Sequence, residues 1–162
     1  KDQNGVNIKD RQGVDLSFTQ NFSLANSTEE KGMRVIKYLP DYANLSRANN
    51  DFVFLRLADV MLMKAEAMAR MSNTGGALTI VNNIRSVRGA SALASVTTDN
   101  ILDERARELY WEGHRRQDQI RFSKFNAPVQ ERTTTTDSHV LIFPIPLEKL
   151  AANPNLHQNP GY

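Results

Sequence analysis

The chain has 162 residues, a formal net charge of +2 and no cysteine. This length allows one domain with a hydrophobic core, and 40% apolar with 23% charged residues is the composition of an ordinary folded protein. The lack of cysteine excludes disulfides, thiolate metal ligands and a cysteine nucleophile. Because basic residues alternate with acidic ones instead of clustering, we expect no nucleic-acid partner.

The start of the sequence carries no targeting signal. Residue 1 is Lys1 and no signal peptide follows it, and no apolar run has the length of a membrane-spanning helix. We therefore expect the chain to be part of a longer protein, with any targeting or lipidation signal upstream of it.

Residues 1–50 are polar and rich in Asn, Ser, Gly and Asp, which predicts loops and turns. Two short apolar stretches, 14–18 and 33–39, are predicted to be strands. The character changes at Asp51, so we divide the chain into a loop-rich segment, 1–50, and a helical domain, 51–162.

Residues 52–71 are rich in strong helix formers and predict a long helix. When the sequence is placed on a helical wheel, Arg56, Asp59, Glu66 and Arg70 share one arc of about 80°. The rest of this helix is apolar, so we expect it to pack on several sides. Its polar stripe should then meet polar groups of other elements.

A second helix is predicted over 77–88, after a turn in which the two glycines of 72–76 break the first helix. Arg85 and Arg88 occupy its last turn, and Gly89 ends it. Two helices of this size joined by a short turn form an αα-hairpin, the unit of tetratricopeptide-like arrays.

The remaining elements are shorter. Thr98 or Asp99 is predicted to cap a helix that runs on from Ile101, Gly113 permits a bend, and another short helix is expected over 115–122. Residues 126–138 read as a polar loop, 139–146 as an extended stretch, and 147–154 as one or two helical turns. The fold class is therefore mostly α, built of helical hairpins with long loops and short β segments.

Glu104, Glu108 and Glu112 are spaced so that they project from a similar side of one helix. Paired carboxylates can hydrolyse a glycosidic bond, and they can bind metal, but the spacing to His114 is wrong for the Glu-x-x-His motif. Each glutamate also has an arginine nearby, which lowers a carboxyl pKa and opposes a general-acid role. Structural ion pairing is the favoured interpretation, with no metal and no cofactor.

Aromatic side chains are the other candidates for function, since an aromatic face can stack on a sugar ring. Trp111 is one, although a single tryptophan within a helix more often packs against its neighbours. Tyr42, in the loop "LPDYANLSR", is the better exposed candidate.

Four stretches together resemble the C-terminal region of the SusD/RagB family, nutrient-binding lipoproteins of the outer surface of Bacteroidetes. In chain order they are "DFVFLRLADVMLMKAEAMAR" (51–70), "ALTIVNNIRSVRGA" (77–90), "ILDERARELYWEGHRRQDQIRFSK" (101–124) and "FPIPLEKLAANPNLHQNPGY" (143–162). The third is the most specific, with Asp-Glu-Arg-x-x-Glu-Leu followed by aromatic-Glu-Gly-His-Arg and Asp-x-x-Arg. Family members are much longer than this chain.

The resemblance implies a non-catalytic protein that captures an oligosaccharide at the cell surface. Its partner would be a SusC-like TonB-dependent outer-membrane transporter, and its membrane association would come from an upstream lipid anchor. Two alternatives stay open: a peptide or other nutrient as ligand, and a glycoside hydrolase using Glu108 or Glu112. Phe22 and Tyr38 join Tyr42 and Trp111 as candidate glycan-binding residues.

The resemblance also implies that the charged segment is architecture, with at least one acid buried against an arginine. The residues expected to form this structural ion-pair network are Arg56, Glu66, Arg85, Glu104, Arg105, Glu108, Glu112, Arg115, Asp118 and Arg121.

Overall fold

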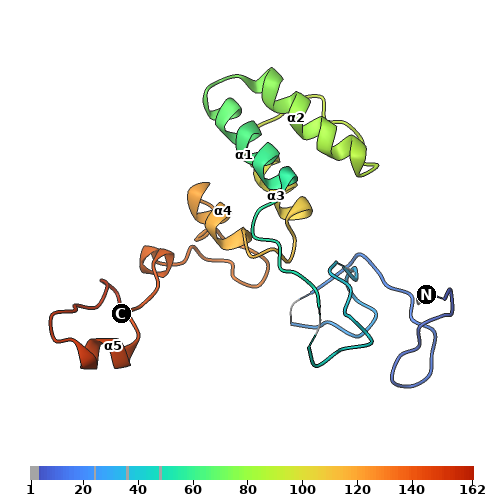
Figure 1. Cartoon of the computed structure of the whole chain (residues 1–162), viewed down its shortest axis with the longest axis horizontal. Coiled ribbons are helices and arrows are strands. Elements are labelled where there is room, and N and C mark those ends of the chain that lie inside the picture. Colours follow the sequence, from blue (N-terminus) through green and yellow to red (C-terminus); the bar gives the residue numbers. More distant parts are fainter. Residues whose placement is uncertain (1–3, 24, 36, 48) are drawn as a thin grey trace. The chain divides into compact units, whose positions relative to one another are not determined.

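The computed structural model describes residues 4–23, 25–35, 37–47 and 49–162, and Figure 1 shows that its regular elements are helices. The chain divides into two compact units. One comprises Lys1–Asn50 with Pro128–Thr135, and the other comprises Asp51–Ala127 with Thr136–Tyr162. The mostly α fold class is confirmed. No helix of the described residues is long and apolar enough to cross a membrane.

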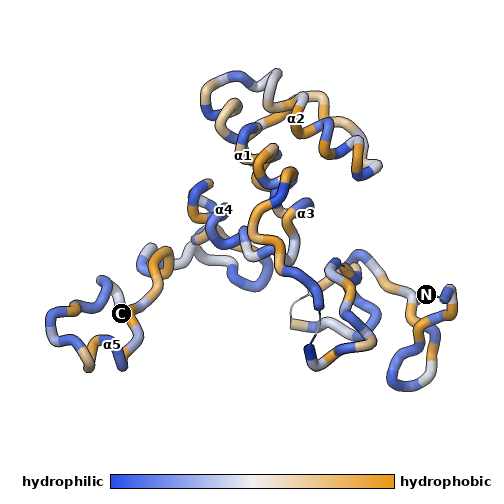
Figure 2. The backbone as a smooth tube through the Cα atoms, viewed as in Figure 1, coloured by the Kyte–Doolittle hydropathy of each residue, from blue (hydrophilic) through white to orange (hydrophobic). Residues whose placement is uncertain are grey.

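The larger unit is built on a helical hairpin of α1 (Leu57–Arg70) and α2 (Thr74–Val87). Figure 2 shows apolar residues recurring along both helices, and those that face each other form the core with residues of α3 (Thr98–Glu108). The buried members of this core are Leu62, Ala65, Ala77, Val81, Ile84, Val96 and Ile101.

Helix α1 packs against α2 and against α3, but part of its apolar surface is not covered. Leu57 is 75% exposed and Val60 is 50% exposed, so one apolar face of the helix remains open to solvent.

The turn between α1 and α2 differs from the predicted one. Ser72 takes the left-handed conformation at φ 64°, and Asn73 caps α2 by accepting a hydrogen bond from the backbone N–H of Gly76 at 3.0 Å. The two glycines therefore lie inside the first turn of α2 instead of supplying the break. Gly76 lies close to the end of the Met68 side chain, which would have to move to admit a Cβ at this position.

The end of α2 is as predicted, with Gly89 at φ 69° just after the C-cap. The following loop is held by Asn82, whose side chain accepts from the backbone N–H of Leu93 at 2.8 Å and donates to its carbonyl at 3.0 Å. The amide thus replaces a backbone partner and holds the loop on α2.

Helix α3 begins at Thr98, and its N-cap is Thr97, one residue before the first of the predicted caps. Thr97 and Asn100 form a capping box, in which each side chain bonds the other residue's backbone N–H, so Thr98 and Asp99 are not the cap. The short helix α4 (Arg115–Arg121) is confirmed. Between α3 and α4 the chain turns through two left-handed residues, Trp111 at φ 65° and Gly113 at φ 78°.

The C-terminal segment contains the 3-10 helix η1 (Ser138–Leu141) and the short α5 (Leu147–Ala152). The predicted extended stretch 139–146 is therefore helical in its first part. Three tail side chains bond backbone groups of 142–145. Gln158 bonds both N–H and C=O of Ile145, Asn159 donates to the carbonyl of Phe143, and the Tyr162 hydroxyl donates to that of Ile142.

The smaller unit consists of loops. The strands predicted over 14–18 and 33–39 are wrong for the described residues, which form only isolated bridges such as Lys9 with Asp15; residue 36 lies outside the described part. Glu131 accepts hydrogen bonds from the Ser23 hydroxyl and the Ala25 N–H at 3.0 Å each, so side-chain contacts hold these loops together.

We predict that Thr97→Ala lowers the free energy of unfolding by about 1 kcal/mol, because the backbone N–H of Asn100 in the first turn of α3 loses its partner. Urea unfolding followed by circular dichroism measures this difference. Thr98→Ala is the matched control, since that hydroxyl caps nothing; equal losses in both variants would contradict the capping box.

Candidate functional site

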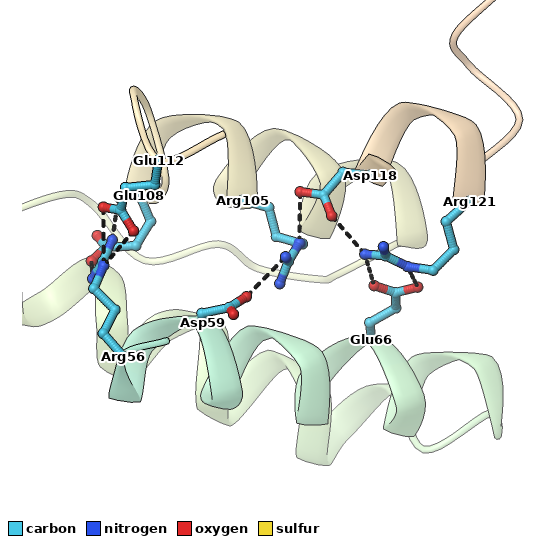
Figure 3. A network of polar contacts seen from close by, with 8 residues as sticks. All are labelled: Arg56, Asp59, Glu66, Arg105, Glu108, Glu112, Asp118 and Arg121. Atoms are coloured by element: carbon cyan, nitrogen blue, oxygen red, sulfur yellow. Dashed lines mark hydrogen bonds and ion pairs between the residues drawn. The ribbon is translucent and has the colours of Figure 1, made fainter. Parts of the chain in front are cut away.

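A row of charged side chains fills the contact between α1 and the segment that contains α3 and α4. Figure 3 shows acids and arginines facing each other along the length of α1. The sequence places them there because the polar arc of α1 is one stripe of an otherwise apolar helix. We call this set the charged seam; it consists of Arg56, Asp59, Glu66, Arg105, Glu108, Glu112, Asp118 and Arg121.

At the N-terminus of α1 the seam is organised by Arg56. Its Nε lies 2.8 Å from Glu112 and its Nη1 lies 2.7 Å from Glu108, and both carboxylates are buried. Burial tends to lower the pKa of Arg56, but the hydrogen bonds that it donates to Glu112 and Glu108 outweigh burial and raise this pKa. Arg88, at the end of α2, donates to Glu108 from a second side at 2.7 Å.

The middle of the seam is Arg105 of α3, which is only 3% exposed. Its Nε donates to Asp118 of α4 at 2.9 Å, and its Nη2 lies 2.9 Å from Asp59 of α1. One buried cation thus joins three helices, with both acids buried beside it.

At the other end, Glu66 of α1 accepts two hydrogen bonds from Arg121 at 2.9 Å each, and Arg70 donates at 2.9 Å. Burial tends to raise the pKa of Glu66, yet the bonds from Arg121 and Arg70 lower it overall. Arg121 also donates to Asp118 at 2.7 Å, which links this end to the middle of the seam.

A second set of pairs joins α2 to α3. Arg85 lies 2.7 Å from buried Glu104, which also accepts from Arg107 at 2.8 Å. Among the described residues, Arg115 is the one member of the expected ion-pair network without a carboxylate partner, and its Nη1 donates to the carbonyl of Leu102 at 3.0 Å. The sequence analysis missed Asp59 and Arg88, although the helical wheel had placed Asp59 on the polar arc.

The three glutamates do not project from one helix as expected, because α3 ends at Glu108 and Glu112 lies in the turn beyond it. Glu108 and Glu112 still meet, since both bind Arg56. Hydrogen bonds from Arg88 and then Arg56 lower the pKa of Glu108 to about 2 despite its burial. A carboxyl group that is ionised at neutral pH cannot donate a proton as a general acid.

Nothing in the described residues gathers three or more His, Asp or Glu side chains into a possible metal site. The seam holds five acids and three arginines, and Arg70 and Arg88 pair with Glu66 and Glu108 from outside it, which brings the arginines to five. Its arrangement fits the joining of helices.

The aromatic candidates lie outside the seam. Phe22 (49% exposed), Tyr38 (39%) and Tyr42 (66%) belong to the loop unit. Trp111 belongs to the helical unit and is 66% exposed in the turn after α3, so the interpretation that it packs within a helix is wrong. Its ring stacks on that of Tyr110 with centroids 6.1 Å apart.

Comparisons with known proteins agree on one family. The model of the SusD family matches residues 12–127. Starch-binding protein SusD of Bacteroides thetaiotaomicron is 32% identical over 81% of this chain, and SusD-like protein P38 of Formosa agariphila is 30% identical over 85%. The chain spans only 26% and 30% of the lengths of these two relatives.

The fold of this chain is also similar to that of a solved structure. Surface glycan-binding protein A from Bacteroides uniformis superposes with a TM-score of 0.61 at 29% identity. The match covers 73% of this chain and 29% of that one.

We predict that Glu108→Ala lowers the free energy of unfolding by about 3–5 kcal/mol, because Arg56 and Arg88 lose a shared buried partner. Asp103→Ala is the control on the same helix, where the side chain is exposed. Thermal unfolding compares the two. A Glu108→Ala variant that melts with Asp103→Ala would contradict a structural role for the seam.

The same carboxylate predicts a pH dependence. Its pKa is lower in the folded chain than the ordinary 4.5, so its ionised form stabilises the fold above about pH 4.5, and this contribution is lost as pH falls toward 2. The stability difference between wild type and Glu108→Gln should therefore shrink between pH 5 and about pH 2. Urea titrations across that range measure it, and a constant difference would contradict the lowered pKa.

Proposed function

Because this chain belongs to the SusD family, we propose that it is part of a cell-surface protein that binds an oligosaccharide without cleaving it. The protein delivers the bound sugar to a SusC-like TonB-dependent transporter in the outer membrane, to which an upstream lipid anchor attaches it. The support is the similarity over most of this chain to relatives named as starch-binding and glycan-binding.

The observation in the structure that carries the proposal is the state of the carboxylates. A glycosidase needs one carboxyl group with a raised pKa beside a second carboxylate. Glu108 has instead a pKa lowered to about 2 by Arg88 and Arg56, and Glu112 is bound to Arg56 at 2.8 Å. Binding without hydrolysis is consistent with this arrangement.

Exposed aromatic residues supply surfaces on which sugars can stack. Tyr42 and Trp111 are each 66% exposed, and neither is needed to fill the core. We assign Tyr42 and Trp111 as the first candidates for sugar contact, with Phe22 and Tyr38 as further candidates. A peptide or other nutrient as ligand is the alternative within the same family.

Affinity electrophoresis against soluble glycans tests the proposal. We expect at least one glycan to retard the native chain, and Tyr42→Ala to reduce that retardation severalfold because a sugar-stacking face is lost. Leu45→Ala is the matched control, since Leu45 is 70% exposed in the same loop and offers no ring. No retardation by any glycan would reject sugar binding by this chain, and retention by immobilised peptides would favour the alternative.

Hydrolysis is tested on the same glycans. We expect no release of reducing ends above a protein-free blank. If sugar is released and Glu108→Gln abolishes the release, the chain is a glycosidase and the binding proposal is wrong.

A further inference from the structure

The turn between α3 and α4 forms one wall of a cavity of about 440 Å³. We call it the Trp111 pocket; the residues that matter here are Tyr110, Trp111, Gly113, Arg115 and Arg116. Small-molecule sites in proteins occupy roughly 300–1,000 Å³, so one or two sugar rings fit its size. No acidic residue is among those that line it.

The charge of this pocket is unusual for the helices α1–α4. All of the other arginines in these helices, and those at the two ends Arg56 and Arg88, lie within ion-pair distance of a carboxylate. Arg115 and Arg116 have no carboxylate partner among the described residues. Neither positive charge is neutralised by an acid of the described residues.

Both guanidinium groups are held in place by neutral contacts. Arg115 donates from Nη1 to the carbonyl of Leu102 at 3.0 Å. Arg116 donates to the carbonyls of Val140 and Leu141, and its guanidinium lies 4.0 Å from the centre of the Phe143 ring and 4.9 Å from that of Phe125. These contacts fix the position of the cations without neutralising them, and a held guanidinium is well suited to a planar anion.

The backbone conformation also positions the aromatic rings of Tyr110 and Trp111. Trp111 has φ 65°, a left-handed conformation that is unfavourable for a residue with a Cβ and is often found at functional sites. Its ring stands 66% exposed and stacks nearly parallel to Tyr110, with an angle of 19° between the planes. The strained turn thus presents a broad aromatic surface beside two uncompensated cations.

We propose that the Trp111 pocket binds an acidic sugar residue, one that carries a carboxylate or a sulfate ester. The sugar ring stacks on Trp111, and its anionic group is held by Arg115 and Arg116. This inference rests on the proposed glycan binding and adds to it the class of sugar recognised.

Isothermal titration calorimetry with three probes tests the proposal. The probes are a short oligomer of galacturonic acid, its neutral methyl ester, and a sulfated galactose oligomer. We expect wild type to bind at least one of the acidic probes about tenfold or more tightly than the ester, since a charge-assisted hydrogen bond contributes that much. The acidic probe that binds more tightly shows whether a carboxylate or a sulfate is preferred.

Variants separate the pocket from general electrostatic attraction. Arg115→Gln should weaken acidic-probe binding about tenfold, and Trp111→Ala should weaken binding of every probe. Lys64→Gln is the control, because it removes one exposed positive charge outside the pocket and should leave all affinities unchanged. Equal losses in Arg115→Gln and Lys64→Gln would overturn the proposal.

The remaining outcomes also decide. If wild type binds the ester as tightly as the acidic probes, the acidic subsite is wrong while glycan binding stands. If wild type binds none of the probes but is retarded by neutral glycans in electrophoresis, the acidic subsite is wrong and glycan binding stands. If nothing binds in either assay, both proposals are wrong. If Arg115→Gln does not fold, Trp111→Ala serves as the test. Unchanged binding of the acidic probes by Trp111→Ala would then overturn the proposed subsite.

Discussion

Arg105 is the constraint on which the rest of the helical unit depends. An arginine keeps its charge under all ordinary conditions, so burying it requires acids at fixed positions around it. Asp59 from α1 and Asp118 from α4 meet this need. Because α3 carries the cation and two other helices carry the anions, no one of the three can move away without leaving a buried charge unpaired.

The alternation of sign along α1 adds a second constraint. Arg56 faces two glutamates, Asp59 faces Arg105, and Glu66 faces Arg121. One helical turn is about 5.4 Å. Sliding α1 by one turn would bring Arg56 toward Arg105, or Asp59 toward Glu108, and each shift places like charges together. The apolar core tolerates a one-turn shift of α1 more easily than the seam does, since apolar side chains carry no charge and their attraction is not directional. The seam therefore specifies register, and its buried pairs contribute specificity more than net stability.

Much of this arrangement can be predicted from the sequence, because the spacing of apolar and polar residues is visible without knowing which residues they contact. The hairpin, the polar arc of α1 and the short helix α4 could all be predicted from spacing. The helix ends could not: Thr97 and Thr98 have the same capping chemistry, and only the three-dimensional position of Asn100 decides between them. The apolar stretches 14–18 and 33–39 look like strands by composition, but a strand needs a paired neighbour, and these loops have only isolated bridges.

The exposure of Trp111 could not be predicted from the sequence either, because it results from contacts of the charged seam. A helical continuation from α3 would have carried Glu112 along the helix, whereas the chain leaves the helix at Glu108. Glu112 turns back to accept hydrogen bonds from Arg56, and Arg115 donates to the carbonyl of Leu102 on α3. The turn is thus held at both ends by contacts to α1 and α3. Trp111 lies between these two contacts. Its left-handed backbone conformation allows the short connection to turn from α3 to α4. The same ion pairs that fix the scaffold therefore also hold the one tryptophan of the chain on its surface, so the position of Trp111 depends on Arg56 and Glu112.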